Sequence, residues 1–130
     1  MGQQQLLLIV LSAIIVGVSI IVGLNMFSSS AVQSNIDAVT QDVMTIASRA
    51  QEWWRKPAQM GGGGRDWTGV SLIRINFPDS TINGSYAVSI VGSNLQIVGT
   101  GIEDGDGDGT PISVTTTVDS TNIISTVVAD

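Results

Sequence analysis

The sequence predicts an α+β fold in which one long N-terminal α-helix, apolar and then amphipathic, packs on a small antiparallel β-sheet. Three observations predict it. Residues 6–27 form an uncharged apolar run, apolar side chains then recur at helical spacing as far as Trp53, and from Trp67 onward apolar and polar residues alternate. The chain of 130 residues has room for one modest domain beside such a helix. The predicted parts are an apolar helix half (1–31), an amphipathic helix half (32–58), a glycine-rich connector (59–69) and an antiparallel sheet domain (70–130).

The apolar run contains neither charge nor proline over about 22 residues, so a helix of this length spans roughly 33 Å, close to the ~30 Å hydrocarbon core of a bilayer. It can cross a membrane or form the apolar centre of a polymer of identical helices. A secretory signal cleaved near Ala31 fits less well, because the run is too long and no basic residue precedes it. The side chains expected to make assembly contacts are Leu6, Leu7, Leu8, Ile9, Val10, Leu11, Ile14, Ile15, Val18, Ile21, Leu24 and Phe27.

The helical pattern continues beyond the apolar run. Apolar residues follow one another at alternating intervals of four and three positions, at Val32, Ile36, Val39, Val43, Ile46, Ala50 and Trp53. This spacing places them on one face of a helix. We therefore expect one continuous helix from about residue 3 to about residue 57, ended by Pro57. The apolar face is expected to pack on the sheet.

Four consecutive glycines, residues 61–64, predict a flexible connector after the helix. Trp53, Trp54 and Trp67 flank these glycines and are expected to pack the connector down, although a cage that stacks on a ligand is an alternative. A phosphate-binding loop is not indicated, because the lysine and the strand–loop–helix context of that motif are missing.

The remaining sequence predicts an antiparallel meander of four or five strands. The expected strands are residues 70–77, 86–91, 95–102, 112–118 and 122–128. Turns are expected at Pro78-Asp79 and at residues 92–94. One face of the sheet is expected to cover the helix and the Ser/Thr-rich face to be solvated. Asn83 begins a short Asn-Gly-Ser match to the N-glycosylation pattern.

The densest group of charged residues is Glu103, Asp104, Asp106 and Asp108. The three aspartates and Gly109 match the first half of a calcium-binding loop, in which alternate carboxylates turn toward one hard cation. The second half of the motif is not matched, since Thr115 occupies the position of the bidentate glutamate; Glu103 or Asp119 would have to complete the site. Ca²⁺ is thus the one cofactor that the sequence suggests, and a solvated acidic turn is the alternative.

Charge and composition exclude several classes of function. Residues 67–130 carry seven acidic side chains and one basic side chain, Arg74, so this part repels phosphate and a nucleic-acid partner is not expected. The chain has no cysteine and no histidine, which removes thiolate chemistry and histidine-based acid–base groups. The carboxylates are clustered and are not spaced as a proton-transferring pair. We do not expect an enzyme.

Residues 3–27, QQQLLLIVLSAIIVGVSIIVGLNMF, resemble the apolar helix of type IV pilins and pseudopilins, which begins directly after a glycine, here Gly2. The layout of the whole chain is also similar to that family. The resemblance implies processing at Gly2, a single-pass intermediate in the inner membrane, and partners in a pilus assembly machinery. It further implies a homopolymer with the apolar helices in its core and the sheet at the cell surface. The chain differs from the family in lacking basic residues before Gly2 and in having Leu7 where a glutamate is common.

The sequence thus favours a structural subunit of an extracellular type IV pilus-like filament. Two alternatives stay open: a single-pass membrane anchor that displays a small β binding or scaffolding domain, and a pseudopilin of a secretion system. A basic stretch after the apolar run would have favoured a resident anchor. The chain instead has uncharged serines at residues 28–30, and the helical pattern continues, which favours the polymer.

Overall fold

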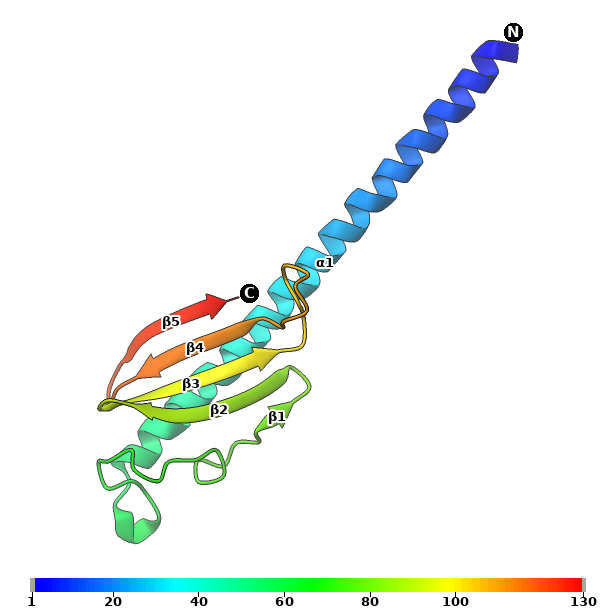
Figure 1. Ribbon diagram of the computed structural model, residues 1–130. Helices are drawn as coiled ribbons and strands as arrows, with labels where there is room; N and C mark the ends of the chain where they lie inside the picture. Colours follow the sequence, from blue (N-terminus) through cyan, green and yellow to red (C-terminus); the bar gives the residue numbers. More distant parts are fainter. Residues whose placement is uncertain (1, 130) are drawn as a thin grey trace. The chain divides into compact units, whose positions relative to one another are not determined.

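The computed structural model describes residues 2–129 and confirms the α+β fold (Figure 1). Its elements are α1 (Gly2–Arg55), the 3-10 helix η1 (Ala58–Met60), and the strands β1 (Ser80–Thr81), β2 (Gly84–Val91), β3 (Asn94–Gly101), β4 (Ser113–Val118) and β5 (Ile123–Ala129). The predicted continuous helix is confirmed to within two residues at its C-terminal end. By its internal contacts the chain forms two compact units, one up to Ala31 and one from Val32 onward, and each is described by itself.

The first unit is the apolar half of α1. Among the described residues, α1 is the one helix long and apolar enough to cross a membrane, as judged by length and composition. Near its N-terminus it contains a stretch of 18 residues with a mean hydropathy of 3.0. The hydroxyl groups of Ser12 and Ser19 donate hydrogen bonds to the carbonyls of Leu8 and Ile15, each at 2.8 Å. These bonds satisfy the two serines within the helix, which suits surroundings that contain no water.

The second unit contains the sheet, whose strands follow one another in the order β1-β2-β3-β4-β5, each antiparallel to its neighbour. Gly92 and Ser93 form the turn between β2 and β3, so Val91 pairs with Asn94. Gly92 has a φ of 62°, a left-handed conformation that glycine adopts without steric cost. The predicted meander is therefore confirmed, with five strands.

The amphipathic half of α1 packs on one face of this sheet, as predicted from its apolar spacing (Figure 1). Val39, Val43, Ile46, Ala50 and Trp53 are buried, while the first two positions of the pattern, Val32 and Ile36, are partly buried. Their partners in the core alternate along the central strands, as Leu95, Ile97, Val114 and Val118. Side chains at helical spacing on α1 and at alternate positions on β3 and β4 thus form one core.

Glycines on β3 let the helix approach the sheet closely. A Cβ atom on Gly99 would lie 2.7 Å from Val39 Cγ1 and 2.8 Å from Val43 Cγ2. One on Gly101 would lie 2.2 Å from Asn35 Oδ1. Only a residue without a side chain fits between β3 and α1 at these two points.

The predicted strand at residues 70–77 is wrong. This segment forms successive turns, in which the Ile75 N–H donates to the Ser71 carbonyl and the Phe77 N–H donates to the Leu72 carbonyl. Leu72 and Ile75 are both buried, whereas Ile73 is 89 % exposed. A strand would have turned Leu72 and Ile75 to opposite faces, and the turns bring both to the core. The first strand of the sheet is instead the two-residue β1, which the sequence did not predict.

The glycine connector was predicted to be flexible, but its backbone is bonded to the end of α1. The N–H groups of Gly63, Gly64 and Arg65 donate to the carbonyls of Trp53, Lys56 and Trp54 at 2.8–2.9 Å. These bonds satisfy carbonyls that a helix end otherwise leaves without partners. The predicted packing by tryptophans is confirmed: Trp53 Nε1 donates to the Gly61 carbonyl, and the rings of Trp54 and Trp67 lie 6.2 Å apart.

Candidate functional site

The predicted assembly residues form a continuous apolar surface on the first half of α1. All twelve are exposed, from 53 % at Leu11 to 79 % at Phe27. They occur on every side of the helix, because they include runs of adjacent residues and each residue is turned by about 100° from the last. Among residues 2–129, no other segment covers them. This surface is suited to contact with lipid or with other apolar helices.

The two predicted modification sites stay predictions. Gly2 is the first residue of α1, and apart from the adjoining helix backbone and its chain neighbours no atom lies within 4 Å of a Cβ built there. Met1, which precedes it, lies outside the described residues. Asn83 is half-buried, and its Nδ2 atom donates to Asp42 Oδ2 at 3.1 Å. A glycan on Nδ2 would leave one N–H for that hydrogen bond.

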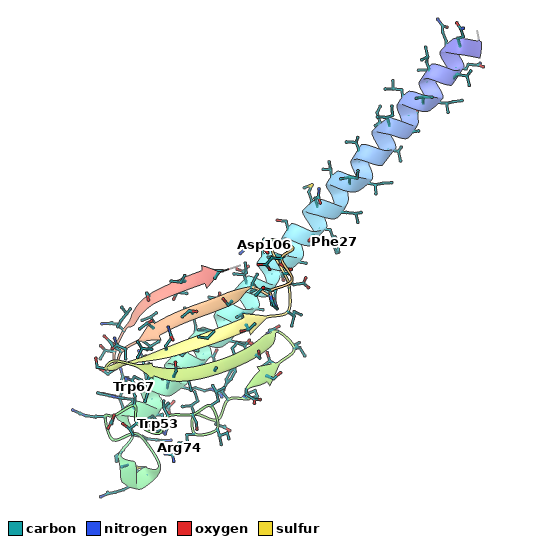
Figure 2. The ribbon with its side chains drawn as sticks, viewed as in Figure 1. Phe27, Trp53, Trp67, Arg74 and Asp106 are labelled. Atoms are coloured by element: carbon teal, nitrogen blue, oxygen red, sulfur yellow. The ribbon has the colours of Figure 1, made fainter. Side chains whose placement is uncertain are left out.

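The acidic loop joins β3 to β4 and brings three predicted metal ligands together (Figure 2). One carboxylate oxygen from each of Asp104, Asp106 and Asp108 lies within 4.8 Å of the other two. The carboxylate of Asp104 also accepts hydrogen bonds from the N–H groups of Gly107 at 2.9 Å and Gly109 at 2.6 Å. The loop thus folds around the Asp104 side chain and turns the other two aspartates toward it.

Two carboxyl groups of this loop have pKa values shifted from their ordinary values, in opposite directions. The Gly109 N–H, and after it the Gly107 N–H, hold the pKa of Asp104 below its ordinary value. A hydrogen bond from the Asp108 N–H also acts to lower the pKa of Asp106, but desolvation and the neighbouring Asp108 carboxylate outweigh it and raise that pKa. The Asp106 and Asp108 carboxylates are therefore close enough for the charge on Asp108 to act on Asp106.

The structure does not bring the other proposed ligands into this group. Glu103 lies outside it, and Thr115 is part of β4. Asp119 belongs to the β4–β5 turn at the opposite end of the sheet, where the Thr121 and Asn122 N–H groups hold its pKa below the ordinary value. Calcium takes six to eight oxygen ligands, so three carboxylates would need carbonyls and water to complete the shell. Binding of calcium stays a prediction.

Two polar residues of α1 that the sequence did not single out anchor the helix to the sheet. Asn35 Oδ1 accepts hydrogen bonds from the N–H groups of Ile102 at 3.0 Å and Glu103 at 3.2 Å, and Asn35 Nδ2 donates to the Asn83 carbonyl. Asn35 therefore fixes the start of the acidic loop. A polar residue beside an apolar helix stripe was the available sign, but its partners lie 48 to 68 positions away in the sequence.

Asp42 is the second anchor. Its Oδ2 atom accepts hydrogen bonds from the Tyr86 hydroxyl, from Thr81 Oγ1 at 3.2 Å and from Asn83 Nδ2. Burial and the hydrogen bond to Asp42 raise the pKa of Tyr86 to about 12. This network holds β1 and β2 to the helix.

A second apolar surface lies on the edge strand β5. Ile123, Ile124, Val127 and Val128 are 45–57 % exposed, and all seven residues of the strand are exposed. On its outer side β5 pairs with no described strand, and it carries no charge. Sheet edges of this kind invite contact with another chain.

Comparisons with protein-family models, curated proteins and solved structures give no match for this chain. The architecture itself, an apolar N-terminal helix whose continuation packs on an antiparallel sheet, is compatible with a pilin-like fold. The function must accordingly be inferred from the surfaces described above.

Proposed function

We propose that this chain is a structural subunit of an extracellular type IV pilus-like filament that polymerises through the apolar half of α1. One observation carries the proposal. The apolar half of α1 is exposed along its whole length, whereas the amphipathic half belongs to a unit with a complete core of its own. The exposed half contributes nothing to that core, so its apolar surface is available for another environment.

Burial among sister helices supplies such an environment. Removing apolar surface from water stabilises an assembly by about 25 cal/mol per Å², and many large side chains contribute here. Apolar residues on all sides of the helix suit a site where neighbours surround it, as in the centre of a fibre. A contact that repeats head to tail without closing gives an open helical polymer.

Before assembly, the same helix would hold the subunit in the inner membrane as a single-pass protein. Its length and hydropathy support that intermediate. We propose that a pilus assembly machinery transfers the subunit from the membrane to a filament at the cell surface. The sheet would then face the solvent and would mediate adhesion. The chain has a structural role in this proposal and no catalytic one.

Filaments sheared from the cell surface test this proposal. We expect cryo-electron microscopy to show residues 6–27 packed around the filament axis, and sequencing of the N-terminus to show whether the mature chain begins at Gln3. Protein that is found only in membranes and is released only by detergent would contradict the proposal and favour the anchored domain. Very short fibres confined to a secretion apparatus would favour the pseudopilin.

A matched pair of variants separates assembly from membrane insertion. Val18→Asn places an amide in the proposed dry core, where an unpartnered polar group costs about 1–3 kcal/mol per subunit. We expect this variant to reach the membrane fraction but to yield few filaments. Gln41→Asn changes an exposed residue on the amphipathic half and should leave the filament yield unchanged. Normal filament yield from Val18→Asn would contradict the core position of this helix.

A further inference from the structure

The basic side chains of the second unit gather at one of its ends. The chain has five lysines and arginines, and all lie between residues 49 and 74, where α1 ends and the glycine connector turns. Figure 2 shows Arg74 at this end, beside Trp53 and Trp67, and Asp106 at the other end of the unit. We call the end that contains Arg74 the basic end. It comprises Arg49, Arg55, Lys56, Arg65 and Arg74.

Within the described residues, these cations bond to carbonyl oxygens and an aromatic ring and not to carboxylates. Arg49 donates to the Asn76 carbonyl and lies 5.6 Å from the centroid of the Phe77 ring, and Arg55 donates to the Ser120 carbonyl at 3.3 Å. Across residues 2–129, none of the five makes an ion pair with a carboxylate. Positive charge is therefore available to an outside partner.

Three of the cations surround a hollow. Arg49, Lys56 and Arg74 line a depression of about 240 Å³ together with a single carboxylate, that of Glu52. Lys56 and Arg74 are exposed to solvent. A hollow with this lining suits an anionic group, because three positive charges face one negative charge.

The opposite end of the unit carries the complementary charge. The acidic loop of Glu103, Asp104, Asp106 and Asp108 lies there, fixed to Asn35 by its first two N–H groups. All basic residues follow Asn35 by at least 14 positions. Between Asn35 and Arg55 the helix rises about 30 Å, so the loop cannot reach the hollow of its own chain.

We propose that the acidic loop of one copy docks on the basic hollow of the next copy. The proposal rests on the filament function and adds to it a polar, end-to-end contact between the sheet units. A second copy fits better than an unrelated acidic partner, because each chain presents both surfaces at opposite ends of one unit. The contact can therefore repeat indefinitely in one direction, as an open polymer requires. Nucleic acid is disfavoured by the formal net charge of −6.

Disulfide trapping in the filament tests the contact directly. The chain contains no cysteine, so Lys56→Cys with Asp106→Cys introduces one thiol at each surface. The two positions are too far apart for a bond within one chain, because a disulfide needs Cα atoms within about 7 Å. Oxidation of filaments should therefore produce a ladder of covalent multimers on a denaturing gel. The control pairs Lys56→Cys with Ser85→Cys, an exposed site on β2, and should produce no ladder.

Charge reversal supplies an independent readout. Lys56→Glu with Arg74→Glu should cause loss of filaments at salt concentrations that the unmodified filament survives. Adding Asp106→Lys and Asp108→Lys restores the original net charge and should restore the salt resistance. The measurements are made in EDTA, so that no divalent cation masks the loop. All four positions are exposed, which keeps the fold intact.

The outcomes separate this inference from the filament proposal. If the unmodified chain forms no filaments, the proposed function fails and the docking contact fails with it. If filaments form but the Lys56–Asp106 pair gives no ladder, the docking contact is overturned and the filament stands. Unchanged salt resistance after charge reversal overturns it in the same way.

Discussion

Val18 and Val39 belong to the same helix, yet Val18 is 56 % exposed and Val39 is completely buried. The two halves of α1 share one backbone geometry and differ in the pattern of their side chains. The second half has one apolar face, which the sheet of the same chain covers, while the first half is apolar all round. A helix that is apolar all round gains its stabilising burial only from a membrane or from other molecules. The following predictions test this difference.

The largest difference is expected from truncating one isoleucine in each half. Ile46 is completely buried, so Ile46→Ala should lower the free energy of unfolding of the second unit by about 2–5 kcal/mol. Ile14 is 58 % exposed, and Ile14→Ala should leave that free energy unchanged. Denaturant unfolding of the full chain in mild detergent measures both. Equal losses from the two substitutions would contradict the division of α1 into an independent half and a packed half.

Glycine substitutions in the two halves should differ by a smaller amount in their effect on the stability of the protein. Gly99→Ala forces a methyl group against the stiff side chains of Val39 and Val43 and should destabilise the second unit by about 1–3 kcal/mol. Gly17 has open space around it, so Gly17→Ala should not destabilise the monomer and adds helix propensity. Thermal unfolding followed by circular dichroism compares them. A Gly99→Ala protein as stable as the unmodified chain would show that α1 does not approach β3 so closely.

Within the packed half, a residue that bonds to the sheet should matter more than a neighbouring residue that does not. Asn35→Ala removes an acceptor from the Ile102 and Glu103 N–H groups and should cost about 1–2 kcal/mol. Gln33 is exposed and its side chain donates to Asp37, one turn along the same helix, so Gln33→Ala serves as the control and should have little effect. Hydrogen exchange at residues 102–103 should accelerate in Asn35→Ala alone. Unchanged exchange there would contradict the role of Asn35 in fixing the acidic loop.

The smallest effect is confined to high pH. The pKa of Tyr86 is raised from 10.0 to about 12, so the folded protein keeps a proton that the unfolded chain releases between these values. The stabilising contribution is therefore complete below pH 10 and is lost as the pH rises toward 12. Tyr86 is the only tyrosine, so ultraviolet absorbance of tyrosinate reports its titration alone. Tyr86→Phe should remove this part of the pH dependence, and an ordinary titration midpoint would contradict the Asp42 contact.

Much of the fold follows from local sequence patterns. The helix could be predicted through residue 55 because no proline interrupts it and its apolar spacing continues to Trp53. β2, β3 and β4 could be predicted because alternation over six to eight residues fixes which side chains share a face, whereas β5 is a short run rich in β-branched residues. The grouping of Asp104, Asp106 and Asp108 likewise follows from their spacing. These are contacts between residues close together in the chain.

Other features depended on the tertiary structure. Residues 70–77 have apolar side chains at both odd and even positions, so only the position of α1 decided that Leu72 and Ile75 turn inward together. The glycine connector is held by carbonyls at the end of α1, which its own composition does not reveal. Asn35 and Asp42 bond to residues at least 39 positions away.

Sequence periodicity by itself determined which elements form and which faces are apolar, because those depend on local geometry. Only the tertiary structure decided which polar groups meet and which charges stay unpaired, because those depend on contacts between distant residues.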